Sequence, residues 1–411
     1  MNLRARIVYP LAGPPIDNGV VTVEGNRIKS VCKHARRRLK REIDLGDVVL
    51  MPGLVNAHCH LDYTHMVGQF PSPRRFTDWL KLITSTKADW TAVEYMDSWR
   101  RGAEMLVLTG TTTVADIEAV PQLLPAVWDT TPLRVISLLE MIGITQRRPP
   151  ETVLQEAVEK ISSLTHPRCE AGLSPHAPYS TVPALLEKTA KAARRKNWLV
   201  CIHVAESKTE FEMFKRGRGE MFEWLLKSGR EMSDCGRGSP VRHLERCGLL
   251  NSRVIATHAN YLAPGDALVL AQNQVSVVHC PRSHQYFEHE AFPLKRLLRA
   301  GVNMCLGTDS LASVVQPRRQ PVQLDMFAEM RSLAGRHLWL RPATILKFAT
   351  VNGARALNRS GLIGVLSPGS LADLIALPCN APKGDLAEAI LDCTKRPVAS
   401  MIDGRWALSP S

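Results

Sequence analysis

Six polar residues of this chain have the side-chain types that hold a divalent metal ion and move protons beside it. In chain order they are His58, His60, His203, Glu206, His258 and Asp309. Three imidazoles and one carboxylate that bind an ion and leave a position for water form a catalytic site rather than a structural one. The pKa of the bound water would fall to about 7 there, which provides hydroxide at neutral pH. The set predicts metal-assisted hydrolysis.

The spacing of these residues suggests a role for each. The expected metal ligands are His58, His60, His203 and Asp309. Glu206 lies shortly after a ligand, so it can take and return a proton without binding the metal. His258 is expected to orient the hydroxide or to stabilise charge on the leaving side. Because a single histidine or aspartate is most often only a hydrogen-bonding group, the prediction depends on their occurring together.

Short apolar runs precede these residues and are typical of buried strands. The runs are 49–55 before the first histidine pair, 198–202 before His203, 254–257 before His258, and 302–306 before Asp309. Side chains of a strand alternate between its faces, so His58 and His60 project together while Cys59 points the other way. The sequence therefore places the whole set at the C-terminal ends of strands.

At these positions the chain resembles the amidohydrolase superfamily. The string Pro-Gly-Leu-Val-Asn-Ala-His-Cys-His at 52–60 looks like its first metal motif. Later strings resemble its branch of cytosine deaminases, adenosine-type deaminases and chlorohydrolases, and the superfamily's closing signature. They lie at 174–179, 203–206, 257–258, 307–310, 349–357 and 369–374. The likeness covers nearly the whole chain.

This resemblance implies an α/β fold, a (β/α)8 barrel with one divalent metal, commonly zinc and sometimes iron. It implies the same four ligands, with Glu206 as proton shuttle, His258 as second catalytic imidazole and His176 as a substrate contact. Relatives with two metals use a carboxylated lysine on the fourth strand, and residues 169–174 contain no lysine. After the seventh strand, residues 279–284 read His-Cys-Pro-Arg-Ser-His instead of the family's Asn-Pro-x-Ser-Asn loop, so no relative's substrate can be carried over.

The rest of the chain predicts two structural parts. Between residues 49 and 359, strand-like runs alternate with helix-like ones, as in a barrel of parallel βα units. Residues 1–48 and 360–411 contain short apolar runs and turn signals, and neither piece is long enough to bury a core alone. We expect them to pair into one small β-sandwich beside the barrel.

Three further features concern the substrate. Glu140 at the end of the third strand and Trp79 after the first are candidate substrate contacts, although each could equally be structural. The segment from 207 to 240 reads as an amphipathic helical insertion, either a lid over the ligand or a packing element. Arginines follow several strands, and Arg282 in particular suggests that the substrate carries a carboxylate or phosphate.

Composition narrows the setting of this activity. The formal net charge is +13, and the basic run at 34–41 invites a nucleic-acid interpretation, but no recognised motif accompanies it and solvated surface is the better interpretation. The sequence lacks an apolar stretch of membrane-spanning length and the long apolar core of a signal peptide. The 10 scattered cysteines suit reduced thiols, so we expect a cytoplasmic protein.

The favoured hypothesis is a hydrolytic deaminase of an aminated purine, pyrimidine or nucleoside-like small molecule. Aminodeoxyfutalosine is one candidate substrate by resemblance. One alternative is hydrolysis of a carbon–chlorine or cyclic amide bond by the same residues, and ammonia release separates the two. A more distant alternative is a non-catalytic scaffold, which typically loses ligands that this chain keeps. Barrels of this family are often dimers, so a homodimer is one expectation.

Overall fold

The computed structural model describes residues 1–34, 41–70, 75–145, 148–316, 321–378 and 385–410. Eight parallel strands form its centre, each hydrogen-bonded to the next strand along the chain. They are β6 (Leu54–Cys59), β7 (Thr111–Glu118), β8 (Arg134–Met141), β9 (Glu170–Pro175), β10 (Val200–Val204), β11 (Val254–His258), β12 (Ser276–His279) and β13 (Asn303–Leu306). The expected (β/α)8 barrel is confirmed.

The barrel closes at the end where the proposed metal ligands lie. A parallel bridge joins Cys59 at the end of β6 to Asp309 after β13. The backbone N–H of Asp309 donates to the carbonyl of His58 at 3.2 Å, and the N–H of His60 donates to the carbonyl of Asp309 at 3.3 Å. The first and last strands therefore meet through the backbone of three site residues.

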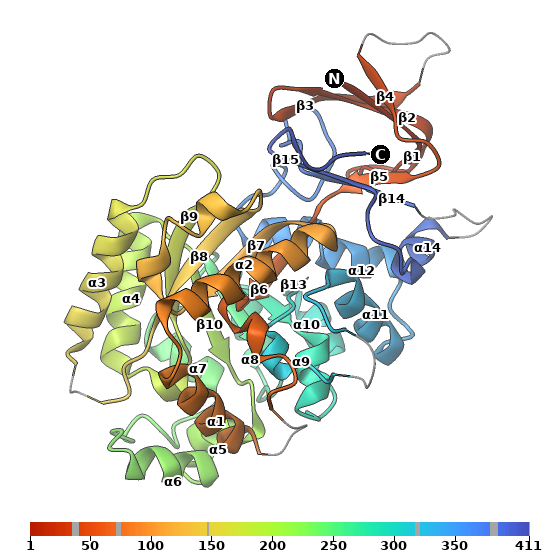
Figure 1. The fold of residues 1–411 in the computed structure, drawn as a ribbon. Coiled ribbons are helices and arrows are strands. Elements are labelled where there is room, and N and C mark those ends of the chain that lie inside the picture. The colour runs from red at the N-terminus through yellow and green to blue at the C-terminus, as the bar shows by residue number, and fades with distance from the viewer. Residues whose placement is uncertain (35–40, 71–74, 146–147, 317–320, 379–384, 411) are drawn as a thin grey trace.

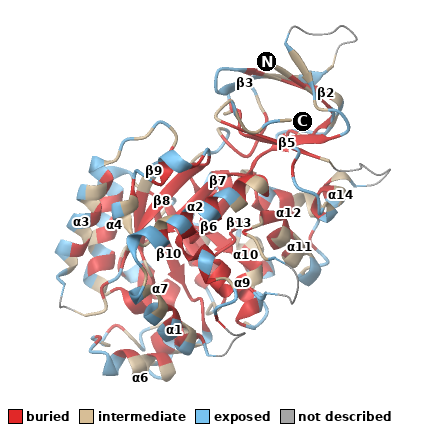
Figure 2. Ribbon diagram, viewed as in Figure 1, coloured by how far each residue is buried: buried red, intermediate tan, exposed pale blue. Residues whose placement is uncertain are grey.

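Helices cover the outside of the barrel, as Figure 1 shows. Those on its flanks are α2 (Ala92–Leu108), α3 (Pro150–Ser163), α4 (Pro183–Lys196), α7 (Pro240–Arg246), α8 (Asp266–Gln272), α9 (Pro281–Tyr286), α10 (Leu294–Ala300), α11 (Met326–Arg336), α12 (Pro342–Phe348) and α13 (Val351–Ala356). Both faces of the strands are thus covered, and all eight residues of β7 are buried. Figure 2 shows the buried residues concentrated in the strands and on the inner faces of the helices.

The two terminal parts of the chain join in a second sheet, and both chain ends lie in it (Figure 1). Its strands are β1 (Asn2–Val8), β2 (Ile16–Glu24), β3 (Arg27–Lys33), β4 (Glu42–Asp44), β5 (Val49–Pro52), β14 (Leu374–Leu377), β15 (Ala399–Ile402) and β16 (Arg405–Leu408). They form one connected sheet of eight strands. The predicted pairing of the two terminal parts is confirmed, and their strands surround an apolar core of their own.

The expected boundary at residue 49 needs a correction. The apolar run 49–55 looks continuous in sequence, but it divides into two strands at Gly53. β5 pairs with β1 and β14 in the terminal sheet, and the barrel begins only with β6. A second departure is α14 (Leu386–Asp392), which packs on α11 and α12 of the barrel. Residues 49–52 and α14 each bury apolar side chains, which either the barrel or the terminal sheet would require. Composition alone therefore could not tell to which of the two parts each segment belongs.

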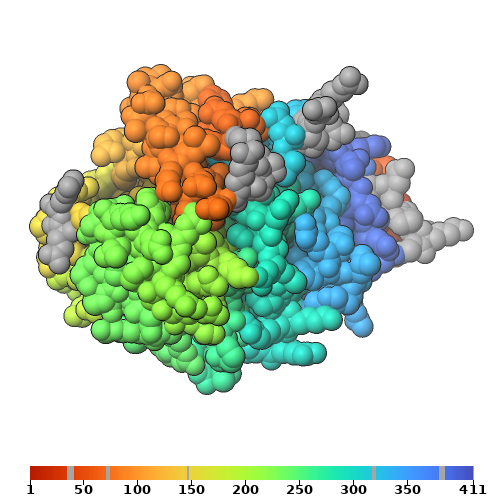
Figure 3. Space-filling view, turned by 90° about the horizontal axis from the view of Figure 1, so that it is seen from below, coloured from red at the N-terminus to blue at the C-terminus, as the bar shows by residue number. Residues whose placement is uncertain are grey.

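Three helices lie at the end of the barrel that carries the ligands. α1 (Phe76–Ala88) follows β6, while α5 (Lys208–Arg216) and α6 (Glu220–Lys227) follow β10. Figure 3 views this end and shows the orange residues of the α1 region against the green residues that follow β10. Among the described residues, no helix combines the length and the apolar character needed to cross a membrane.

Candidate metal centre and active site

Four side chains converge at the C-terminal ends of three strands and form one buried cluster. The Nε2 atoms of His60 and His203 are 3.3 Å apart. The Oδ1 atom of Asp309 lies 3.6 Å from Nε2 of His58 and 3.7 Å from Nε2 of His60. All four residues are buried. The geometry brings together the four residues that the sequence nominated as ligands, with their donor atoms facing one another.

Contacts on the far side of the imidazoles fix which nitrogen faces this centre. Nδ1 of His203 donates to the carbonyl of His176 at 2.8 Å. Nδ1 of His58 lies 3.3 Å from the hydroxyl of Thr257 and 3.7 Å from the thiol of Cys201. Such contacts leave Nε2 as the lone-pair donor, because the tautomer follows the hydrogen bond of the other nitrogen. Thr257 belongs to the motif at 257–258, but the sequence did not indicate this contact with His58.

The protonation of the cluster fits a divalent ion. Nε2 of His58 is buried and has no hydrogen-bond partner among the described residues, an arrangement that needs an explanation in a folded protein. Burial lowers the pKa of His203 well below its ordinary value. Burial alone would raise the pKa of Asp309, but the neighbouring imidazoles of His58, His258 and His60 hold it well below its ordinary value. Burial also lowers the pKa of His60 to about 3, whereas the contacts with Asp309 and Cys201 outweigh burial and raise the pKa of His58 to about 9. Two neutral imidazoles, a third that releases its proton when a metal binds, and an ionised carboxylate are the donor set of a zinc-type site.

Glu206 and His258 lie beside this cluster. Their nearest atoms, Oε1 of Glu206 and Nε2 of His258, are 3.4 Å apart. Burial raises the pKa of the Glu206 carboxyl well above its ordinary value. The carboxylate of Glu210 accepts the backbone N–H groups of Ala205 and Glu206, both at 2.9 Å. Glu210 therefore fixes the loop that carries Glu206, a role that sequence analysis missed although an acid in the first turn of α5 was visible.

The backbone is constrained where the site residues leave their strands. His258 has a φ of 73° and Asp309 has a φ of 53°, both in the left-handed region. Residues in that region cost free energy and are enriched at functional sites. Two residues before Asp309, a Cβ at Gly307 would lie 2.6 Å from the carbonyl oxygen of His58. Only glycine allows the strands to approach this closely.

A cavity of about 90 Å³ opens beside three of the candidate metal ligands, His60, His203 and Asp309, and beside Glu206. The predicted substrate contacts Trp79, Glu140 and His176 line it. Tyr63 and Lys87 also line it and were not predicted. The ring of Tyr63 stacks on His60 with centroids 5.0 Å apart. No local sequence signal identified Lys87, because its place in the cavity depends on how α1 packs over the barrel.

Arg282 does not act as the sequence suggested. Its Nε atom donates to the buried carboxylate of Glu329 at 2.5 Å, and its NH2 group donates to the carbonyl of Gln323 at 3.0 Å. The guanidinium is therefore already paired and is not free to bind an anion of the substrate. The sequence could not reveal this pairing because Glu329 lies on α11, far along the chain.

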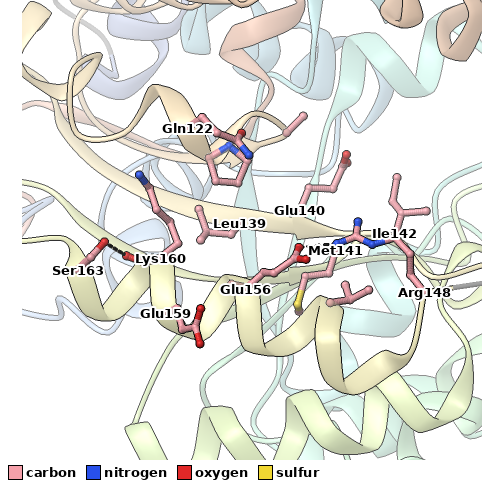
Figure 4. A pocket seen from close by; sticks show the side chains of 14 residues that line it. Gln122, Leu139, Glu140, Met141, Ile142, Arg148, Glu156, Glu159, Lys160 and Ser163 are labelled. Carbon is pink, nitrogen blue, oxygen red and sulfur yellow. Dashed lines mark hydrogen bonds and ion pairs between the residues drawn. The ribbon is translucent and has the colours of Figure 1, made fainter.

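The other described arginines after strands are paired as well. Arg148 lies in a neighbouring cavity of about 700 Å³ outside β8, where it pairs with Glu156 (Figure 4). Arg75 is exposed and lies 3.9 Å from Glu220. Arg74, Arg147, Arg318 and Arg319 lie outside the described residues, as do residues 35–40 of the basic run. The described arginines do not provide the anion site that we expected.

Helix α1 forms the roof of the cavity, and the 207–240 insertion supports it. Trp79, Ile83 and Lys87 of α1 line the cavity. Phe76 and Leu80 pack in one buried cluster with residues of α5 and α6, including Met213 and Met221. Apart from Glu206 just before it, the insertion lies behind α1. The predicted amphipathic helices are present, and their described contacts are those of a packing element.

The fold and the cluster together define a class of protein, the metal-dependent hydrolases built on a (β/α)8 barrel. Comparison with known families is more specific, since residues 49–407 match the Amidohydrolase family. The chain belongs to this family, which confirms the resemblance drawn from its motifs. It is an amidohydrolase, the class of enzyme expected from sequence.

Individual relatives agree with this assignment. A 5-methylthioadenosine/S-adenosylhomocysteine deaminase from Syntrophobacter fumaroxidans is 31% identical over 389 residues, which are 90% of this chain and 82% of that protein. A zinc-bound adenosine deaminase from Xanthomonas campestris is 26% identical with a TM-score of 0.85, covering 99% of this chain and 92% of that one. The zinc complex of an atrazine chlorohydrolase from Arthrobacter aurescens has a TM-score of 0.84 over 99% of this chain and 95% of its own, but at 20% identity it shows likeness of fold alone.

Proposed function

We propose that this protein is a metal-dependent hydrolytic deaminase of an aminated purine nucleoside or a closely similar aminated heterocycle. The observation that carries the proposal is the convergence of the four candidate ligands beside Glu206 and His258, next to a cavity that α1 lines. The relatives named as deaminases of adenosine-type compounds support the substrate class.

We propose one divalent ion, zinc before iron, held by His58, His60, His203 and Asp309. Zinc in the similar adenosine deaminase supports this order. When bound, the ion supplies Lewis acidity that activates a water for attack on carbon. A single ion is favoured because β9 has no lysine to bridge a second one.

The remaining chemistry belongs to the protein's own residues. The reaction adds the oxygen of one water to the carbon that bears the amino group, breaks the carbon–nitrogen bond and releases ammonia. Glu206 takes a proton from the water and returns it to the departing nitrogen, a role that its burial favours because a raised pKa suits both transfers. His258 contacts Glu206 and orients the attacking water. His176, Glu140 and Trp79 hold the substrate against this group.

The experiment that tests the proposal measures ammonia release together with metal content. A panel of adenosine, 5′-substituted adenosines, aminated pyrimidines and pterins is incubated with metal-loaded protein, with a chlorinated triazine included to detect chloride release. We expect ammonia from at least one nucleoside, in proportion to bound metal and abolished by Asp309→Ala. Chloride release without ammonia would overturn the deaminase assignment and favour the alternative hydrolase.

Two broader properties are also proposed. The first is a cytoplasmic location, because the nine cysteines of the described residues are free thiols, as is usual in the reducing cytoplasm. The second is a homodimer, which we propose only because barrels of this family are often dimers. Cell fractionation tests the first proposal, and light scattering during size-exclusion chromatography tests the second.

A further inference from the structure

One lysine enters the cavity from its roof. Lys87, in the last turn of α1, places its Nζ atom 3.7 Å from Oε2 of Glu140 and 4.6 Å from the ring centroid of Tyr63. It also donates a hydrogen bond to the hydroxyl of Tyr63. Lys87 and Glu140 lie outside the metal ligands and the proton-transfer pair. The proposed mechanism places Glu140 against the substrate but gives neither charge a chemical role.

Glu140 presents an ionised carboxylate to the cavity. Its side chain points away from that of its neighbour Met141 on β8 (Figure 4) and is 6% exposed. Burial would raise its pKa, but Lys87, His176 and His60 reverse this and hold the pKa below its ordinary value. The nearest nitrogens of Lys87 and His176 are 3.7 and 3.9 Å away, longer than good hydrogen bonds. The carboxylate thus keeps room for hydroxyl or N–H donors.

The ion pair between Lys87 and Glu140 also sets the charge that the cavity presents to a ligand. Lys87 is the one lysine or arginine among the residues found to line this cavity, and Glu140 neutralises it. The described arginines near the mouth are paired outside it, as shown above. A carboxylate or phosphate in this part of the cavity would therefore face Glu140 without a free cation to offset the repulsion.

We propose that Glu140 is a specificity-determining residue that selects neutral, hydrogen-bond-donating groups and rejects anionic ones. The hydroxyls of a sugar are the chemistry it would take. Lys87 keeps Glu140 ionised and is itself withheld from anions by that pairing. This inference rests on the proposed function for its substrate class, and it replaces the arginine-based expectation of an anionic substrate.

The test compares adenosine with its 3′- and 5′-monophosphates in wild type, Glu140→Gln, Lys87→Met and the double variant. We expect wild type to prefer adenosine in kcat/KM by about tenfold or more over the monophosphate whose anion reaches Glu140, as expected for like charges at short range. Glu140→Gln should narrow or reverse that ratio, because it releases Lys87. The double variant has neither the repelling carboxylate nor the attracting ammonium, so its ratio should lie between those of wild type and Glu140→Gln.

Binding provides a second readout that does not need turnover. The same ligands are titrated calorimetrically into metal-loaded Glu206→Gln, with and without Glu140→Gln. The ratio of the affinity for adenosine to the affinity for the monophosphate should fall in the variant that also carries Glu140→Gln, as the ratio of kcat/KM values does. If Glu140→Gln alters affinity for adenosine and both monophosphates equally, Glu140 is only structural and the inference fails. If no nucleoside releases ammonia but the binding ratio changes as expected, the inference stands and the deaminase proposal fails. Thermal melting of each variant confirms that it is folded.

Discussion

Replacing Glu206 with glutamine should separate proton transfer from metal binding. The two side chains have the same size, so the substitution leaves no cavity beside His258. Burial raises the pKa of Glu206, which means that the folded protein already accommodates the uncharged form. The loop is held through the backbone by Glu210, and this contact does not depend on the side chain at 206. The variant should therefore fold with a free energy of unfolding within about 1 kcal/mol of wild type.

The position of Glu206 beside His258 allows the loss of rate in Glu206→Gln to be estimated. The Glu206 carboxyl lies 3.4 Å from His258 Nε2, and loss of a positioned general acid or base commonly costs ~10²–10⁴-fold in rate. That range corresponds to about 2.7–5.4 kcal/mol in the activation free energy. Metal content should stay at the wild-type level, since Glu206 is not among the four converging ligands.

The assay measures kcat for ammonia release and metal per chain by mass spectrometry on the same preparations. Asp309→Ala is the matched control, because it removes a ligand and should lower both quantities. Equal metal loss in the two variants would mean that Glu206 is a ligand. A kcat of Glu206→Gln within about threefold of wild type would refute its role as proton carrier.

Three further predictions concern packing around the site and the barrel. Thr257→Val removes the group 3.3 Å from Nδ1 of His58 and should weaken zinc binding by about tenfold or more in a chelator competition. In wild type the buried Arg134 lies 3.1 Å from the Asp373 carboxylate and also contacts Asp403. Asp373→Ala leaves Arg134 with Asp403 alone and should lower the free energy of unfolding, measured in urea, by about 3 kcal/mol. Burial lowers the pKa of His243 to about 4. A histidine that is depressed in the folded state binds its proton only on unfolding, so stability is full above pH 6.5 and falls towards pH 4. In that window His243→Gln should flatten the pH dependence by about 1.4 kcal/mol per pH unit.

Each of these predictions has a control and a contrary result. Thr257→Ser keeps a hydroxyl and should bind zinc like wild type; equal weakening in both variants would discount the hydrogen bond. Asp44→Ala breaks the exposed pair with Arg4 and should change stability by less than about 1 kcal/mol, so a similar effect of Asp373→Ala would contradict burial as the cause. An unchanged pH slope in His243→Gln would show that His243 does not couple folding to protonation.

Much of the barrel was predictable because each strand is specified by its own residues. The run at 111–115 is apolar or β-branched along its whole length, and the run at 134–139 is apolar apart from Arg134 and Ser137. They form β7 and β8. The division of 49–55 at Gly53 was not predictable. Both halves are buried, and only pairing with β1 and β14 places the first half in the terminal sheet.

The sequence by itself determined which side chains converge as the candidate donor set, because His58, His60, His203 and Asp309 each lie at the end of a strand that their own preceding residues define. In a barrel of parallel strands those ends must meet, so local order was enough to place them. Only the tertiary structure decided the electrostatics of the cavity. It pairs Arg282 with Glu329 on another helix, and it brings Lys87 from the roof to Glu140 on a strand. The physical reason is that an ion pair depends on how separate elements pack, and no run of neighbouring residues encodes that distance.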